Sequence, residues 1–191
     1  LICNSATSSI PTKSPYIARV SMTLAQHAFG IAKWANQQDI KTVYTLYADY
    51  APGRDANAQF TKIFTAGGGE VVGEIAVPLS SPDFGPYMQR IKDAKPDAVF
   101  MWFPSGELAN TMLKAYRARG LDTDGIKALG TSDLVDDNSL DSMGDDAVGL
   151  ITAAHYSASH DSALNQKFAA AYHAVPGRNP RPTFSALPTS G

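Results

Sequence analysis

The chain has 191 residues, a formal net charge of -2, 44% hydrophobic residues and 18% charged residues, which is an ordinary globular composition. A chain of this length buries a sizeable core without a metal or disulfide staple, and a single cysteine excludes an intrachain disulfide. The near-neutral charge argues against a nucleic-acid partner. No segment reaches the ~18 consecutive apolar residues of a membrane span.

Helical and strand patterns alternate along the chain. In order, the spacing of apolar residues predicts a helix over 21–37, a strand over 41–48, a helix over 55–66, a strand over 70–77, a helix over 84–94, a strand over 98–103, a helix over 107–119, strands over 126–130 and 150–155, and a closing helix over 163–174. The closing helix is expected to turn Leu164, Phe168, Ala171 and Tyr172 inward. Such alternation predicts an α/β fold with a mainly parallel sheet covered on both faces.

The glycine and serine motifs do not match those of nucleotide-binding proteins or hydrolases. Gly67 to Gly69 lie between a helix and a strand, the wrong order for a dinucleotide loop, and are interpreted as a helix C-cap. The sequence contains no phosphate-binding G-x-x-x-x-G-K-[ST] motif and no G-x-S-x-G elbow. Ser105 follows a strand but lacks a preceding glycine, so we interpret it as an N-cap or hydrogen-bonding residue rather than a nucleophile.

Metal-binding patterns are also missing. His155 and His160 are five residues apart, and His27 and His173 lie on separate predicted helices, so we expect surface or partly buried histidines and no metal site. An acidic cluster between 133 and 146 lacks the spacing of a calcium loop and is interpreted as a solvated loop.

Aromatic, hydroxyl and carboxylate side chains follow the predicted strands. Ligands of parallel sheets bind outside the carboxyl ends of the strands, and this set would suit a small organic ligand. The alternative is that Tyr50 and Phe103 simply cover the end of the sheet. The residues concerned are Asp49, Tyr50, Phe103, Pro104, Ser105, Thr131, Ser132, Asp133 and Tyr156.

Residues 48–121 resemble the central part of the type I periplasmic solute-binding proteins of ABC transporters, the branched-chain amino-acid binding group. The resemblance lies in a strand ending in D-Y, an E-V-V strand, a helix starting with D-F, and K-P-D-A-V before the next strand. Residues 130–156 match the strand, loop and turn that follow. The stretches MWFPSGE and HYSASHDS are similar to members that serve aromatic or other carboxylate-bearing solutes.

The resemblance implies a three-layer, Rossmann-like α/β lobe of a periplasmic or extracellular protein with two lobes. Such a protein is not an enzyme, needs no cofactor, closes on a small amino acid or aromatic acid, and delivers it to an ABC permease in the membrane. By position, Tyr50 and Phe103, with Ser105 nearby, match aromatic contacts to the ligand. Asp133 or Ser132 falls where amino-acid binders place the acid that meets the ligand ammonium. The segment Ser5, Ala6 and Thr7 resembles the one that holds the ligand carboxylate.

Members of this family have about twice this length. We therefore expect residues 1–18 to be a stub of the first lobe and its crossover, residues 19–175 to form the second lobe, and residues 176–191 to begin a truncated return segment. Exposed apolar edges would then favour self-association. Two other hypotheses stay open: the ligand-sensing domain of a receptor or regulator, and a small α/β enzyme with Asp49 or Asp133 as a general base.

Overall fold

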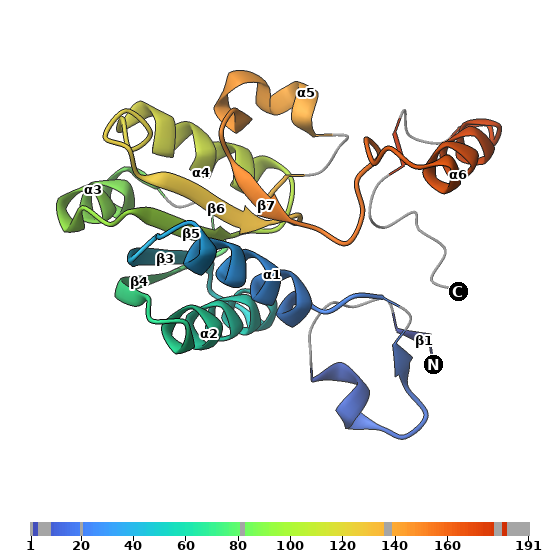
Figure 1. Ribbon diagram of the computed structural model, residues 1–191, viewed down its shortest axis with the longest axis horizontal. Coiled ribbons are helices and arrows are strands. Elements are labelled where there is room, and N and C mark those ends of the chain that lie inside the picture. Colours follow the sequence, from blue (N-terminus) through green and yellow to red (C-terminus); the bar gives the residue numbers. More distant parts are fainter. Residues whose placement is uncertain are drawn as a thin grey trace.

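A five-stranded, entirely parallel sheet forms the centre of the computed structural model (Figure 1). The structure describes residues 2–3, 9–19, 21–80, 83–135, 139–177 and 181–182. The strands of the sheet are β3 (Thr42–Ala48), β4 (Glu70–Val77), β5 (Ala98–Trp102), β6 (Lys127–Thr131) and β7 (Ile151–Ala153). All five predicted strands are therefore confirmed, although β7 is shorter than predicted.

The strand order is β4-β3-β5-β6-β7. The chain runs from β3 outward to the edge strand β4, crosses back over β3 to β5, and then continues outward through β6 and β7. The direction of progress thus reverses between β3 and β5, which makes this pair the topological switch point of the sheet. In open parallel sheets, a crevice forms at that point, outside the carboxyl ends of the strands.

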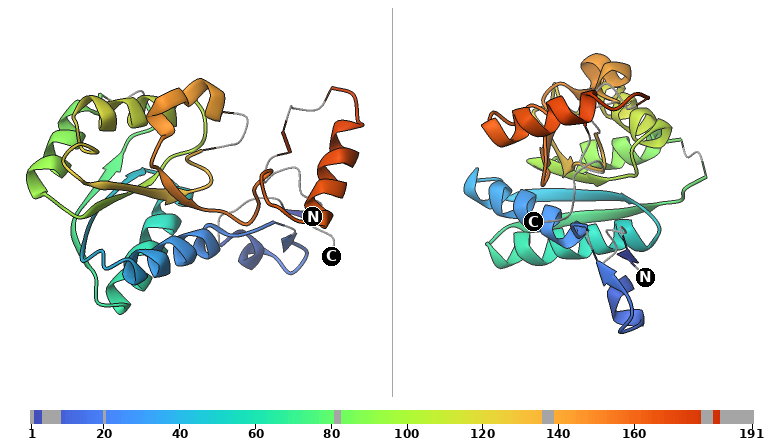
Figure 2. Two further views of the ribbon diagram at one scale, coloured as in Figure 1. Left: turned by 45° about the horizontal axis from the view of Figure 1, so that its top comes forward. Right: turned by 90° about the vertical axis from the view of Figure 1, so that its right-hand side faces the viewer.

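Helices cover both faces of the sheet (Figures 1 and 2). One face carries α1 and α2, and the other carries α3, α4 and the short pair α5 and η2. Their bounds are α1 (Leu24–Gln37), α2 (Ala51–Ala66), α3 (Gly85–Ala94), α4 (Glu107–Ala118), α5 (Leu140–Met143) and η2 (Gly144–Ala147). This arrangement confirms the predicted three-layer α/β fold.

Local sequence explains where the first two helices begin and end. Thr23 caps α1 reciprocally with Gln26, which satisfies two amide groups that the helix leaves free. Helix α2 starts four residues earlier than predicted, because Pro52 fits the first turn, where its missing N–H is not needed. Gly67 ends α2 as predicted, and Gly68 follows with φ 93°.

Aromatic side chains fill the layer between α2 and the sheet. Phe60 stacks on Phe100 with ring centroids 4.0 Å apart and on Phe64 at 5.4 Å, and all three are fully buried. Strand β5 is buried at every position, whereas the edge strand β4 alternates between exposed and less exposed residues. The centre of the core therefore lies around β3 and β5, the two strands that flank the switch point.

The segments at the two ends of the chain lie apart from the sheet, beyond the carboxyl ends of its strands (Figures 1 and 2). The first contains β1 (Ile2–Cys3), η1 (Ile10–Lys13) and β2 (Ala18–Arg19), and the second contains α6 (Ala163–His173). The expectation that this last helix closes the α/β layer is wrong, because the chain leaves β7 in an extended segment that carries α6 away from the sheet.

The side chains of α6 agree with this separation. Leu164, expected to face inward, is 79% exposed, and Ala171 is exposed as well. Phe168 and Tyr172 are half-buried through local ring contacts, with Phe168 against Tyr156 at 5.9 Å. The expected division into 1–18, 19–175 and 176–191 stays a prediction. Across the described segments, none of the helices is long and apolar enough to cross a membrane.

Candidate ligand-binding site

Three short segments leave neighbouring strands at one edge of the sheet. They begin with Asp49 after β3, Phe103 after β5 and Ser132 after β6. Strands β3 and β5 pair directly, with Tyr47 opposite Trp102 at the last position of their register. These segments therefore meet at the topological switch point.

Tyr50 and Trp102 form an aromatic pair at this point. Their ring centroids are 5.5 Å apart and the rings are tilted by 50°. Tyr50 is half-buried at the N-cap of α2, and Trp102 is 3% exposed at the end of β5. The buried Nε1 of Trp102 has no hydrogen-bond partner in the described part of the chain. An unpaired buried donor costs about 1–3 kcal/mol, so this N–H is a candidate donor to a ligand.

Gly53 allows the start of α2 to approach these residues. A Cβ atom at Gly53 would lie 2.1 Å from the carbonyl oxygen of Ala48 and 3.2 Å from the Trp102 ring. Because the first neighbour is backbone, it could not move aside cheaply. A side chain at this position would push α2 away from the end of β3, and Tyr50 with it.

Asp133 adds a carboxylate on the β6 side. Its side chain is 16% exposed, and its Oδ2 accepts a hydrogen bond of 2.9 Å from Oγ1 of Thr131. Burial raises the pKa of the Tyr50 phenol, and the negative charge of Asp133 raises it further. The two residues are thus electrostatically coupled across the ends of β3 and β6, and Asp133 can accept a hydrogen bond or face a cation there.

Ser132 is more buried than Asp133, and both side chains lie near Nδ1 of His27. Ser132 is 5% exposed, and its Oγ lies 3.4 Å from Nδ1 of His27 on α1. Its amide donates to the carbonyl oxygen of Ala153 in β7. A pocket of about 180 Å³ adjoins Ser132 and Tyr156 beyond the ends of β6 and β7.

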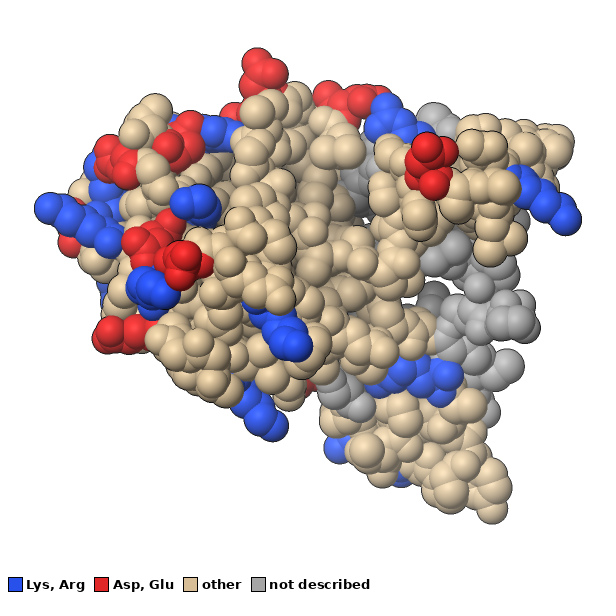
Figure 3. All heavy atoms as spheres, in the orientation of Figure 1, with Lys and Arg blue, Asp and Glu red and all other residues tan. Residues whose placement is uncertain are grey.

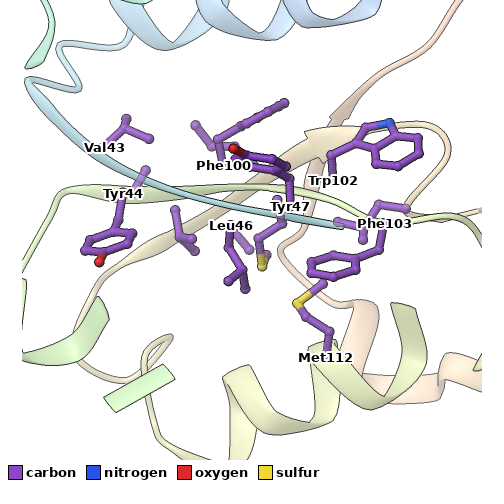
Figure 4. Packing of buried hydrophobic residues seen from close by; sticks show 14 of the residues in the cluster. Val43, Tyr44, Leu46, Tyr47, Phe100, Trp102, Phe103 and Met112 are labelled. Carbon is purple, nitrogen blue, oxygen red and sulfur yellow. The ribbon is translucent and has the colours of Figure 1, made fainter. Parts of the chain in front are cut away.

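Phe103 belongs to the core, and its role as an aromatic contact to the ligand stays a prediction. It is fully buried and meets Phe84 edge to face, with ring centroids 5.4 Å apart. Figure 4 shows its ring beside Met112 of α4, whereas Trp102 projects on the opposite side of the sheet. Its ring therefore offers no surface to a ligand in this structure.

Two further predictions concern Ser105 and the segment Ser5, Ala6 and Thr7. Ser105 is exposed, but the N-cap of α4 is Gly106, with φ 117°, so the N-cap alternative for Ser105 is wrong, whereas its role near the ligand stays a prediction. A backbone with this φ favours glycine. The segment Ser5, Ala6 and Thr7 lies outside the described residues.

Sequence reasoning missed Trp102 and the histidines beside Ser132. His27 was expected at the surface or partly buried, but it is 3% exposed and its Nε2 lies 3.0 Å from Nδ1 of His155. A signal existed, since His27 shares the inward stripe of α1 with Leu24 and Ile31. Within the described residues, no group of three or more His, Cys, Asp or Glu side chains could hold a metal ion.

On the face that Figure 3 shows, most charged side chains lie away from α6. Figure 3 shows Lys, Arg, Asp and Glu side chains gathered around the α3 end of the molecule, with fewer on the part of this face nearer α6. Lys92 there bridges to Asp124 with an N–O distance of 2.9 Å. The carboxyl edge of the sheet therefore presents a few specific polar groups among apolar ones, as small-molecule sites do.

A family model described as periplasmic binding protein matches residues 1–189. The chain belongs to this family. Among curated relatives, the Leu/Ile/Val-binding protein homolog 6 of Brucella abortus is 44% identical to it over 168 residues, which are 88% of this chain and 43% of the relative. These findings confirm the resemblance to type I periplasmic binding proteins.

Solved structures of periplasmic binding proteins share the fold. An ABC-transporter solute-binding protein of Rhodopseudomonas palustris BisB5, in complex with 3,4-dihydroxybenzoic acid, is 53% identical with a TM-score of 0.84, over 95% of this chain and 49% of that one. Another from R. palustris, in complex with 4-hydroxybenzoate, is 40% identical with a TM-score of 0.86, over 96% and 49%. The chain thus spans about half the length of the relatives it matches.

Proposed function

We propose that this chain supplies one half of the ligand site of an ABC-importer solute-binding protein, and that the solute is a hydroxylated aromatic carboxylate. The observation that carries the proposal is the convergence of Tyr50, Trp102 and Asp133 at the switch point. The half-buried Tyr50 ring offers flat apolar surface to an aromatic solute, and the buried Trp102 ring packs against it. Asp133 offers an acceptor to a phenolic hydroxyl, and the unpaired Trp102 N–H offers a donor.

The solute carboxylate would be held from the opposite lobe. The segment Ser5, Ala6 and Thr7 is our candidate, because amides and hydroxyls satisfy a carboxylate well. We further propose that the protein works in the periplasm or outside the cell, delivers the solute to an ABC permease in the membrane, and has no catalytic role; its family supports this. The hydroxybenzoate complexes of the two R. palustris relatives support this solute class.

An amino acid is the second candidate solute. Asp133 supports it, since a carboxylate can face an ammonium group, and so does the name of the Brucella relative. Of the two candidates at this position we choose Asp133, because its side chain is 16% exposed whereas Ser132 is 5% exposed.

Isothermal titration calorimetry of the complete gene product separates these solutes. We expect 4-hydroxybenzoate and 3,4-dihydroxybenzoate to bind more tightly than benzoate, and benzoate more tightly than leucine. Thermal stabilisation should follow the same order, because a ligand that binds the folded state stabilises it by RT ln(1 + [L]/Kd). Tighter binding of leucine would establish the amino-acid alternative, and failure of all four compounds would refute the proposal.

The 191-residue chain should bind the same solutes more weakly, because it presents half of a cleft. Exposed apolar side chains such as Leu164 and Val175 would favour its self-association. Sedimentation equilibrium tests this expectation, and a monomer at all concentrations would contradict it.

A further inference from the structure

His27 connects the candidate ligand-binding carboxylate to a second histidine. Its Nε2 lies 3.0 Å from Nδ1 of His155, and the two rings stack with centroids 5.2 Å apart. On its other side, His27 Nδ1 lies 3.4 Å from Oγ of Ser132 and 3.9 Å from Oδ2 of Asp133. His27 itself is 3% exposed, so it acts on the site through these neighbours and not by touching a solute.

The number of hydrogens on the ring nitrogens of His27 and His155 decides which atoms donate and which accept. In the neutral histidine pair, the 3.0 Å contact holds one hydrogen, because one nitrogen donates and the other accepts. If Nε2 of His27 donates, its Nδ1 is left to accept from the Ser132 hydroxyl. When the pair takes up one more proton, both nitrogens of His27 can donate. A positively charged Nδ1–H then faces Asp133.

The charged and titratable groups around the pair come from three directions. His155 faces His27 from the segment after β7, and Asp133 faces it from the segment after β6. Tyr50, after β3, is coupled to Asp133, but its raised pKa keeps it neutral where histidines titrate. The carboxylate of Asp133 lies 3.9 Å from Nδ1 of His27, so added positive charge on His27 acts on this carboxylate.

We propose that His27 is a positioning residue that sets the solute preference of the site, because its proton state controls how strongly Asp133 accepts a hydrogen bond from the solute. This inference rests on the proposed function, in which Asp133 meets a phenolic hydroxyl. With the pair neutral, Asp133 is available to the hydroxyl, and hydroxybenzoates are preferred over benzoate. With the pair charged, His27 attracts the same carboxylate and the preference shrinks.

The first test needs no solute. Histidine titrations followed by NMR on the 191-residue chain compare the wild type with Asp133→Asn. Loss of the carboxylate that lies 3.9 Å from Nδ1 should move the pH at which the His27 ring signals change to a lower value than in the wild type. His173, which lies on α6, serves as the internal reference. An unchanged titration of His27 in Asp133→Asn would overturn the inference, whatever the protein binds.

The second test measures the solute preference against pH. In the complete gene product, we expect the ratio of the Kd for benzoate to the Kd for 4-hydroxybenzoate to fall by roughly tenfold between pH 8 and pH 5.5. A tenfold change in Kd corresponds to the net contribution of about one hydrogen bond. His27→Gln keeps polar contacts but takes up no proton, so its ratio should not change with pH. His160→Gln, at an exposed position, is the control and should behave as the wild type.

Each outcome of this second test has one meaning. The same fall of the ratio in His27→Gln and in the wild type overturns the role of His27 and leaves the proposed function standing. If the wild type binds neither compound, the proposed function fails, and the NMR titration still decides whether His27 and Asp133 are coupled. Should His27→Gln not fold, His155→Gln interrupts the pair from an exposed position and should also flatten the pH dependence.

Discussion

Asp97 and Thr42 close a ring of hydrogen bonds between the starts of β5 and β3. Oδ2 of Asp97 accepts from the amide and the hydroxyl of Thr42 at 2.8 and 3.0 Å, and the Asp97 amide lies 3.0 Å from the same hydroxyl oxygen. Oδ2 also accepts from the amide of Lys41 at 2.8 Å. This ring of hydrogen bonds fixes the register in which Tyr47 lies opposite Trp102 at the other end of the two strands.

The hydrogen bonds to the Asp97 carboxylate make the free energy of unfolding depend on pH. Burial alone would raise the pKa of Asp97, but the hydrogen bonds from Thr42 and Lys41 and the charge of Lys127 together lower it. The carboxylate is therefore stabilised in the folded state, and its contribution is present above its unfolded pKa of about 4 and lost as the pH falls through the lower folded pKa. Because Asp97 is exposed and solvent screens these interactions, Asp97→Ala should lower the free energy of unfolding at pH 7 by about 1 kcal/mol.

Urea unfolding at a series of pH values checks this prediction. The difference between wild type and Asp97→Ala should shrink as the pH falls below about 4, because the wild type then loses the same interactions. Asp39→Asn is the matched control, since Asp39 is 92% exposed and pairs only at the surface with Lys41. It should change stability by less than about 0.5 kcal/mol. A difference at pH 7 that persists unchanged at pH 2 would contradict the explanation.

Trp102→Phe should separate binding from stability. The variant keeps an aromatic ring but removes the unpartnered Nε1–H. Its stability should stay within about 1 kcal/mol of the wild type, because relief of an unpaired buried donor opposes the loss of packed atoms. The affinity for 4-hydroxybenzoate should fall about three- to tenfold with the loss of one hydrogen bond. Calorimetry measures the affinity and thermal unfolding measures the stability. An unchanged affinity would show that this N–H does not donate to the solute.

Phe103→Leu should lower stability and leave the affinity for the solute unchanged, the reverse of what we expect for Trp102→Phe. Because Phe103 packs inside the core against Phe84, the smaller side chain should lower the free energy of unfolding by about 1–2 kcal/mol. The affinity of the folded protein for 4-hydroxybenzoate should stay within about twofold. Tyr50→Ala is the comparison, and its loss of a ring at the site should weaken binding roughly tenfold. A larger effect of Phe103→Leu than of Tyr50→Ala on affinity would place Phe103 in the site after all.

Two glycine-to-alanine changes in helices should act in opposite directions. Gly53→Ala places Cβ 2.1 Å from the Ala48 carbonyl oxygen, so α2 must shift and stability should fall by more than about 3 kcal/mol. Gly30→Ala places Cβ in ordinary contact, 3.5 Å from Cβ of Ala153, and should stabilise α1 by about 0.4–1 kcal/mol. Denaturant unfolding of both variants decides the point. Similar effects of the two changes would contradict the close approach at Gly53.

Much of the fold follows from local patterns in the sequence. The run AVFMWF predicts β5, since an unbroken apolar stretch suits a strand buried on both faces. Gly67 ends α2 where the sequence predicts a cap. The last helix shows the limit, because its apolar spacing predicts where it forms but not what it packs against. Leu164 is exposed on α6 for this reason.

The sequence by itself determined the alternation of strands and helices, the family, and which strand ends carry polar and aromatic groups. The tertiary structure decided which side chains meet there. In a fully apolar strand there is no alternation to show which face a residue takes, so the sequence could not assign Phe103 to the face covered by α4 and Trp102 to the face covered by α2. His27 and His155 are 128 positions apart, and no local pattern joins them. Their contact, like the coupling of Tyr50 to Asp133, exists because the parallel sheet brings distant segments to one edge.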